Sequence, residues 1–154
     1  MYVLGFGNPA REDDGIGPAI VEALENESLP GVTLDANYQL TVEDAAEIAE
    51  HDVVIFVDAS VDETAEPVAF ELVEPARGGS FSTHSVSPGD VLGMAHDMFG
   101  SHAEAYLLSV RGYSFRMFTE EMTPEAKANT ERATELLRNL LETRDFKRFA
   151  GGSS

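Results

Sequence analysis

The most informative stretch of the sequence is Gly5-Phe6-Gly7-Asn8-Pro9-Ala10-Arg11-Glu12-Asp13-Asp14-Gly15. Residues 1–6 are mainly apolar and lead into Gly7-Asn8-Pro9, a pattern typical of a buried strand that ends in a turn. From Ile16 onward, apolar residues recur at the spacing of a helix. The stretch therefore predicts a strand, an acidic loop and a helix in succession.

The rest of the chain continues this alternation. The run Val53-Val54-Ile55-Phe56-Val57 has no polar alternation, as expected of a central parallel strand covered on both faces. Further strands are predicted at 32–38, 68–73 and 105–110, with 68–73 antiparallel or at an edge. Helices are predicted after Thr41, from Ser87 to about Gly100, and from Thr123 to about Leu141. This order predicts an α/β fold, a three-layer sandwich around a mostly parallel, twisted sheet of about five strands.

Length and composition narrow the class of protein. A chain of 154 residues with 43% hydrophobic content suits one domain, which we assign to residues 1–143, followed by a flexible tail at 144–154. No apolar run reaches about 18 residues, so we expect no membrane partner. The N-terminus reads as a strand and lacks the basic and apolar regions of a signal peptide, so we expect a cytoplasmic protein. We also expect it to be a monomer. The absence of cysteine excludes disulfides, thiolate metal sites and a cysteine nucleophile.

The charge of the chain is strongly acidic. Asp and Glu number 28 against 10 Lys and Arg, which gives a formal net charge of -18. Such a charge repels phosphate backbones, so we expect no nucleic-acid partner. Most of these acids are expected to form a solvated surface, although the charge also favours cationic partners or metal ions.

Three polar features are predicted at the carboxyl ends of strands, where open parallel sheets bind ligands. They are the Glu12-Asp13-Asp14 cluster, Asp58 and His84. Two carboxylates and an imidazole form a plausible open coordination shell for a divalent ion, and imidazole suits nickel or zinc better than magnesium. A structural role is open for each: the cluster precedes a helix and is more simply explained as a cap, and His84 as a loop residue.

Asp58 is harder to explain structurally, because a carboxylate at the end of an apolar strand is costly unless solvated or paired.

Two other kinds of site, a dinucleotide site and a serine hydrolase site, are disfavoured. The glycines resemble a dinucleotide fingerprint, but the third glycine is missing and three acids would oppose a pyrophosphate. Ser82, Thr83 and Ser85 lack the context of a nucleophile elbow, which argues against a serine hydrolase.

The spacing Gly5-x-Gly7-Asn8, four residues, Asp13-Asp14-Gly15-x-Gly17 resembles the N-terminal signature of the nickel-iron hydrogenase maturation endopeptidases. Val57-Asp58-Ala59 and Ser82-Thr83-His84 follow in the expected order. The resemblance implies a phosphorylase/hydrolase-like fold and metal contacts at Asp14, Asp58 and His84, with Asp14 and Asp58 as the catalytic carboxylates. This sequence departs from the family pattern after the second predicted strand, where Asp35-Ala36 stands in place of an aspartate-glycine pair found in some relatives.

The same resemblance implies an activity. The family removes a C-terminal extension from the hydrogenase large-subunit precursor after nickel insertion, with nickel supplied by the substrate and not held permanently. Two alternatives stay open at this stage. One is a noncatalytic nickel-binding assembly factor. The other is a peptidyl-tRNA hydrolase, because Gly5-Phe6-Gly7-Asn8-Pro9 resembles the opening turn of that family, although the other motifs of that family are missing here.

Overall fold

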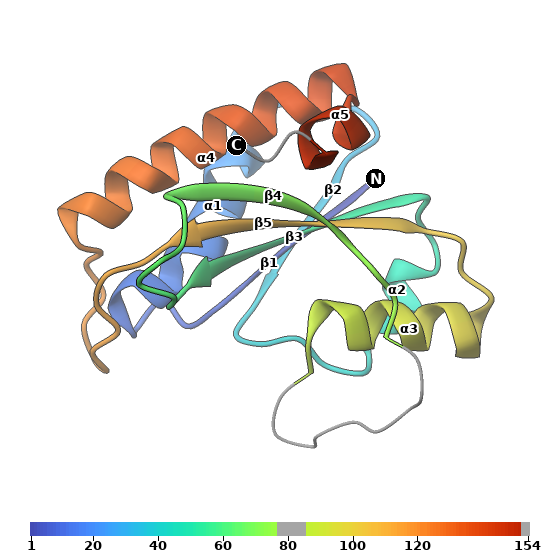
Figure 1. The fold of residues 1–154 in the computed structure, drawn as a ribbon, viewed down its shortest axis with the longest axis horizontal. Helices are drawn as coiled ribbons and strands as arrows, with labels where there is room; N and C mark the ends of the chain where they lie inside the picture. The colour runs from blue at the N-terminus through green and yellow to red at the C-terminus, as the bar shows by residue number, and fades with distance from the viewer. Residues whose placement is uncertain (77–85, 152–154) are drawn as a thin grey trace.

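The structure, a computed structural model, describes residues 1–76 and 86–151 and contains one five-stranded sheet (Figure 1). The strand order is β2-β1-β3-β5-β4. All neighbouring strands are parallel except β4, which pairs antiparallel with β5 at an edge. The bounds of the strands are β1 Tyr2–Phe6, β2 Thr33–Asn37, β3 Val53–Ser60, β4 Val68–Val73 and β5 Glu104–Arg111. The predicted mostly parallel, five-stranded sheet is confirmed.

Helices cover both faces of this sheet, which gives the predicted three layers. The helical elements are η1 Glu12–Gly15, α1 Ile16–Glu25, α2 Asp44–Ile48, α3 Pro88–Phe99, α4 Pro124–Thr143 and α5 Phe146–Gly151. Helices α1 and α4 pack together on one face, and α2 and α3 on the other (Figure 1). Each face has its own apolar core, so alternate residues of the central strands contribute to different cores. No helix in the described part of the chain is long and apolar enough to cross a membrane.

The first helix lies unusually close to the sheet. A Cβ atom added at Gly17 would lie 2.6 Å from the carbonyl oxygen of Val57, so only glycine fits between α1 and β3. Ile16, Ile20 and Leu24 are fully buried along the same helix. This close packing brings the loop before α1 next to the ends of β1 and β3.

Two of the predicted helix starts, those of α3 and α4, are confirmed by their capping hydrogen bonds. The Ser87 hydroxyl accepts from the Asp90 amide, and the Asp90 carboxylate accepts from the Ser87 amide, which together form a capping box ahead of α3. Thr123 caps α4 by accepting from the Ala126 amide, with Pro124 at the first helical position. Local sequence therefore determines where these helices begin.

The C-terminal region differs from the predicted flexible tail. Residues 146–151 form helix α5, and Phe146 is buried with only 6% of its surface exposed. Its ring lies 5.5 Å from that of Tyr106, and α5 packs against β4. Six residues have too little local preference to predict a helix, which here is stabilised by the burial of one aromatic ring.

Strand pairing changes at the carboxyl edge between β1 and β3. β1 pairs with β3 only as far as Gly5 and Val57, whereas β3 continues beside β5 up to Ser60 and Arg111. β1 has β2 on its other side, so the chain turns away in opposite directions from β1 and β3. Such a switch point leaves a crevice at the strand ends, which is where α/β sheets bind ligands.

Candidate active site

Asp14 is held by the turn that leaves β1. Its Oδ2 accepts a hydrogen bond of 2.7 Å from the Asn8 amide, which closes the turn. Gly7 has a φ of 145°, and a Cβ atom there would lie 2.0 Å from the main-chain oxygen of Asp14. The turn can therefore carry Asp14 at this place only because position 7 has no side chain.

Asp58 lies just beyond the last residue of β3 that pairs with β1. Its Oδ1 accepts a 2.8 Å hydrogen bond from the Ala59 amide. Burial, together with the negative charge of Asp14, raises the pKa of Asp58 to about 7, although the Ala59 hydrogen bond lowers it. A carboxyl group that titrates near neutral pH at a strand end is a candidate acid–base group.

The structure brings Asp14 and Asp58 together, as the sequence predicted. Both line one concavity of about 220 Å³ at the switch point. The other lining residues are Phe6, Gly7, Tyr38, Gln39, Leu40 and Val86. His84, the third predicted ligand, lies outside the described residues, as do Ser82 and Thr83.

Within residues 1–76 and 86–151, no group of three or more His, Asp or Glu side chains could hold a metal ion. Asp14 and Asp58 alone offer two carboxylate ligands, and a divalent transition ion prefers more ligands, including nitrogen. The described residues therefore fit a partial shell that a ligand from outside would have to complete.

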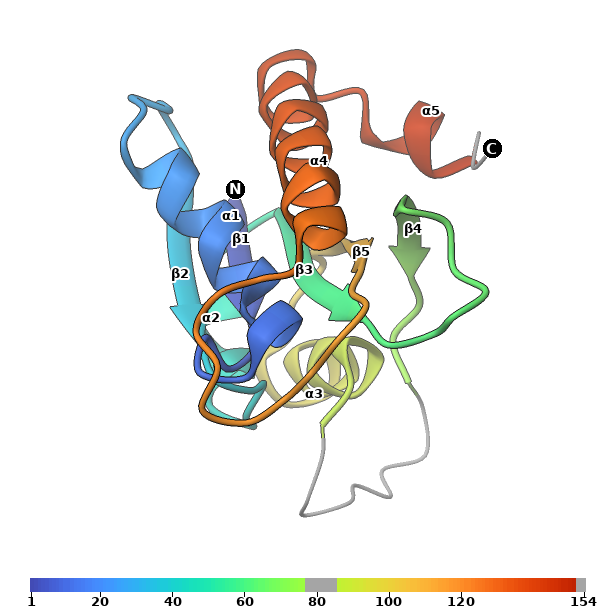
Figure 2. The ribbon, with the colours of Figure 1, turned by 90° about the vertical axis from the view of Figure 1, so that its left-hand side faces the viewer.

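Glu12 and Asp13 do not cap α1, which corrects the structural role considered for the acidic cluster. The residue at the N-cap of α1 is Gly15, and no side chain caps this helix. Both acids instead bind residues 112–123, which we call the anchored segment. Figure 2 shows it running around the Glu12–Gly15 turn on its way from β5 to α4.

Glu12 and Asp13 are almost completely buried, and hydrogen bonds compensate for the loss of water around their carboxylates. Asp13, with no exposed surface, accepts from the amides of Tyr113 and Ser114 and from the amide and hydroxyl of Thr123. Glu12 accepts from the Ser114 hydroxyl and forms a 2.7 Å ion pair with Arg116. These contacts hold the pKa of Glu12 at about 2, because hydrogen bonds from Arg116 and Ser114 stabilise its charged form.

Sequence reasoning missed the anchored segment and the residues of the loop after β2. Tyr38 lines the concavity and is 74% exposed. Polar partners 100 residues apart leave no local signal in the sequence, whereas the run of three acids before a helix did mark the turn after β1 as unusual.

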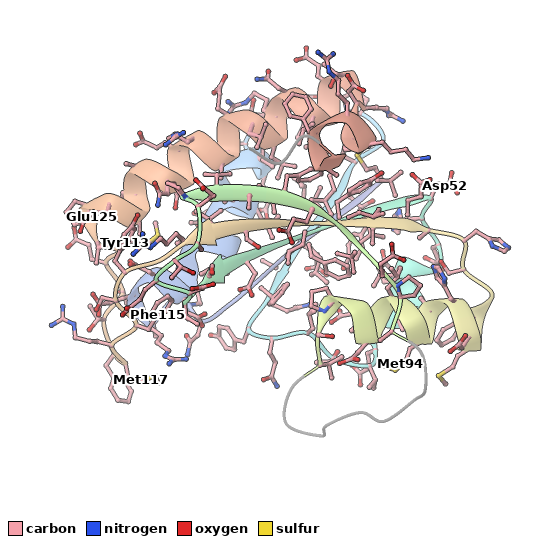
Figure 3. The ribbon with its side chains drawn as sticks, in the orientation of Figure 1. Asp52, Met94, Tyr113, Phe115, Met117 and Glu125 are labelled. Atoms are coloured by element: carbon pink, nitrogen blue, oxygen red, sulfur yellow. The ribbon has the colours of Figure 1, made fainter. Side chains whose placement is uncertain are left out.

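Figure 3 shows Tyr113, Phe115 and Met117, of the anchored segment, at one end of the molecule. Asp52, just before β3, lies at the other end.

The fold and the paired carboxylates define a doubly wound α/β protein with Asp14 and Asp58 in one concavity at its switch point. No protein-family model matches the sequence, and no curated protein is similar enough to count as a match. Several solved structures are similar to this chain over nearly its whole length, and the three described below are hydrogenase maturation proteases. The fold of this chain is therefore that of the nickel-iron hydrogenase maturation proteases.

Three of these solved structures show the extent of the similarity. The [NiFe] hydrogenase maturation protease HycI from Thermococcus kodakarensis KOD1 has a TM-score of 0.70 and 26% identity over 92% of this chain and 91% of its own. The hydrogenase maturating endopeptidase HybD from E. coli has a TM-score of 0.69 and 27% identity over 92% of both chains. The hydrogenase 2 maturation peptidase from Thaumarchaeota archaeon SCGC_AB-539-E09 has a TM-score of 0.67 and 25% identity over 92% and 97%.

Proposed function

We propose that this chain is an endopeptidase that removes the C-terminal extension of a nickel-iron hydrogenase large-subunit precursor after nickel insertion. The observation that carries the proposal is the meeting of Asp14 and Asp58 in one concavity, on a fold similar to that of maturation proteases. The nickel ion belongs to the substrate: the precursor carries it, and the enzyme recognises the precursor through contacts with it.

In this scheme Asp14, Asp58 and His84 contact the nickel ion of the precursor. Two carboxylates and one imidazole are a suitable set for a borderline ion that already has ligands from the precursor. Val86, two residues after His84, lines the same concavity as both carboxylates. Binding through the ion would fix the scissile peptide against the site, and this positioning lowers the entropic part of the barrier.

Asp58 is our candidate for the general base. Its pKa of about 7 is that of the protein without nickel; the charge of the precursor's nickel ion would lower this pKa and keep Asp58 in the charged form that a general base needs. Oδ1 is bound to Ala59, and no other described residue donates a hydrogen bond to this carboxylate. Asp58 would take a proton from water as the water oxygen attacks the peptide carbonyl, and the proton would then pass to the leaving amine as the C–N bond breaks. Asp14 would contribute charge and orientation.

The decisive experiment is mass spectrometry of a nickel-loaded precursor incubated with the protein. Loss of the C-terminal peptide is expected with the wild type, and a loss of activity of at least 100-fold with Asp58→Asn, Asp14→Asn or His84→Ala. Asp52→Asn is the matched control, because Asp52 is an exposed carboxylate at the opposite end of β3 (Figure 3). Full cleavage by both Asp14→Asn and His84→Ala would exclude the metal-guided scheme.

The same experiment separates the enzyme from a noncatalytic nickel-binding assembly factor. Such a factor would form a complex with the nickel-loaded precursor but leave its mass unchanged. A precursor without nickel is the second control, since a protease that recognises the ion should leave it uncut.

A further inference from the structure

A second concavity lies directly beside the candidate active site. It has a volume of about 310 Å³, and its lining residues are Gly7, Pro9, Pro18, Ala36, Asn37 and Tyr38. Gly7 and Tyr38 also line the concavity that contains Asp14 and Asp58. The two hollows therefore share a wall, and an extended peptide could occupy both at once.

The chemistry of the second hollow differs from that of the first. None of its six lining residues carries a charge, although the protein as a whole carries a formal charge of -18. Pro9, Pro18 and Ala36 present carbon atoms, so the hollow favours an apolar occupant. Its volume is at the low end of the range of about 300–1,000 Å³ for small-molecule sites, which suits one side chain better than a whole ligand.

The walls of this hollow are held in place. The Gly7 amide donates a 3.0 Å hydrogen bond to the Asn37 oxygen, so the turn after β1 is tied to the end of β2. Two of the lining residues are prolines, whose φ angles are restricted. A wall fixed in this way can select a side chain by size, because it cannot easily move to admit a larger one.

We propose that this hollow binds an apolar side chain of the precursor, belonging to one of the two residues that flank the cleaved bond. The inference rests on the proposed endopeptidase function and names a subsite for it. A bond held at Asp14 and Asp58 leaves its neighbouring residue about 3.3 Å further along an extended chain, toward the wall formed by Gly7 and Tyr38. Tyr38, 74% exposed in the free protein, would be covered by the bound peptide.

The test substitutes one lining residue by a larger one, so that the new side chain occupies the hollow. Ala36 is exposed on β2, so Ala36→Leu should fold normally while it occupies the space, and Ala36→Val gives a smaller step. Thr33→Leu is the matched control, since Thr33 is exposed on the same strand but does not line the hollow. Nickel-loaded precursors would carry Leu or Gly at each position that flanks the cleaved bond.

At one of the two positions, the wild type and Thr33→Leu should cleave the Leu precursor about tenfold faster than the Gly precursor, measured as kcat/KM. Ala36→Leu should abolish this preference, and Ala36→Val should give an intermediate preference. Cleavage by the wild type with no preference at either position, or with a preference that Ala36→Leu retains, would overturn the inference and leave the proposed function intact.

Peptide binding followed by NMR makes the test independent of catalysis. A peptide with Leu should shift the amide signals of Gly7 and Tyr38, the matching Gly peptide should not, and Ala36→Leu should suppress the shift. If these shifts occur while no precursor is cleaved, the subsite stands and the proposed function fails. If there is neither cleavage nor a shift, both are wrong.

Discussion

The Asp13 carboxylate accepts hydrogen bonds of 2.8 Å from both the amide and the hydroxyl of Thr123, a residue 110 positions further along the chain. Thr123 is also the N-cap of α4. One buried carboxylate thus joins the turn that carries Asp14 to the start of the longest helix. The acid next to Asp14 in the sequence is a structural anchor for the candidate active site.

Asp13→Asn should lower the free energy of unfolding by about 2–4 kcal/mol, because an amide offers one acceptor oxygen where four donors converge. Urea denaturation monitored by circular dichroism would measure the change. Asp97→Asn, at an exposed position of α3, is the control and should change stability by less than about 0.5 kcal/mol. Equal stability of the two variants would show that these hydrogen bonds contribute little.

Asp58 should make stability depend on pH around neutrality. Its pKa is raised from 3.8 in the reference state to about 7 in the folded protein, so the folded state binds the proton more tightly. This contribution is therefore fully present below pH 3.8 and is lost as the pH rises through 7. Asp58→Asn removes the titration and should be more stable than the wild type at pH 8, by on the order of 2–4 kcal/mol. Urea denaturation of both proteins at pH 5 and pH 8 would measure it; an unchanged difference between the two pH values would contradict the raised pKa.

Gly7→Ala should disrupt the turn that positions Asp14. The new Cβ would lie 2.0 Å from the Asp14 main-chain oxygen, so the turn must move or the protein must lose several kcal/mol of stability. Gly100→Ala provides the comparison, because Gly100 also has a positive φ, of 68°, but nothing lies within 4 Å of its added Cβ. That variant should lose only about 1 kcal/mol. Thermal denaturation of both would compare the two costs, and similar losses would rule out the steric argument.

Phe146→Ala should destabilise the protein by about 2–4 kcal/mol, because the ring is 6% exposed and packs against Tyr106. Phe149→Ala in the same helix is the matched variant; its ring is 44% exposed, and we expect a loss below about 1 kcal/mol. Guanidinium denaturation would distinguish them. A negligible effect of Phe146→Ala would mean that α5 adds little to the fold and that the chain from residue 144 behaves as the tail the sequence predicted.

Much of the fold could be predicted from local pattern. The uninterrupted run 53–57 indicated a strand covered on both faces, and Ser87 with Asp90 indicated the start of α3. These signals depend on residues a few positions apart, so they are visible in the sequence. Helix α5 could not be predicted in this way, because its stability comes from contacts with Tyr106 and β4.

For the candidate site, the sequence by itself determined which acids follow strands, since the glycine spacing and the end of the apolar run place Asp14 and Asp58 without any distant contact. Only the tertiary structure decided how the acids of the turn divide their roles. Glu12 and Asp13 are buried against residues 113–123, whereas Asp14 reaches the hollow it shares with Asp58. Three adjacent carboxylates are chemically alike. The segment that buries Glu12 and Asp13 lies about 100 residues further along the chain, and the pocket that Asp14 reaches is formed with Tyr38, Asp58 and Val86.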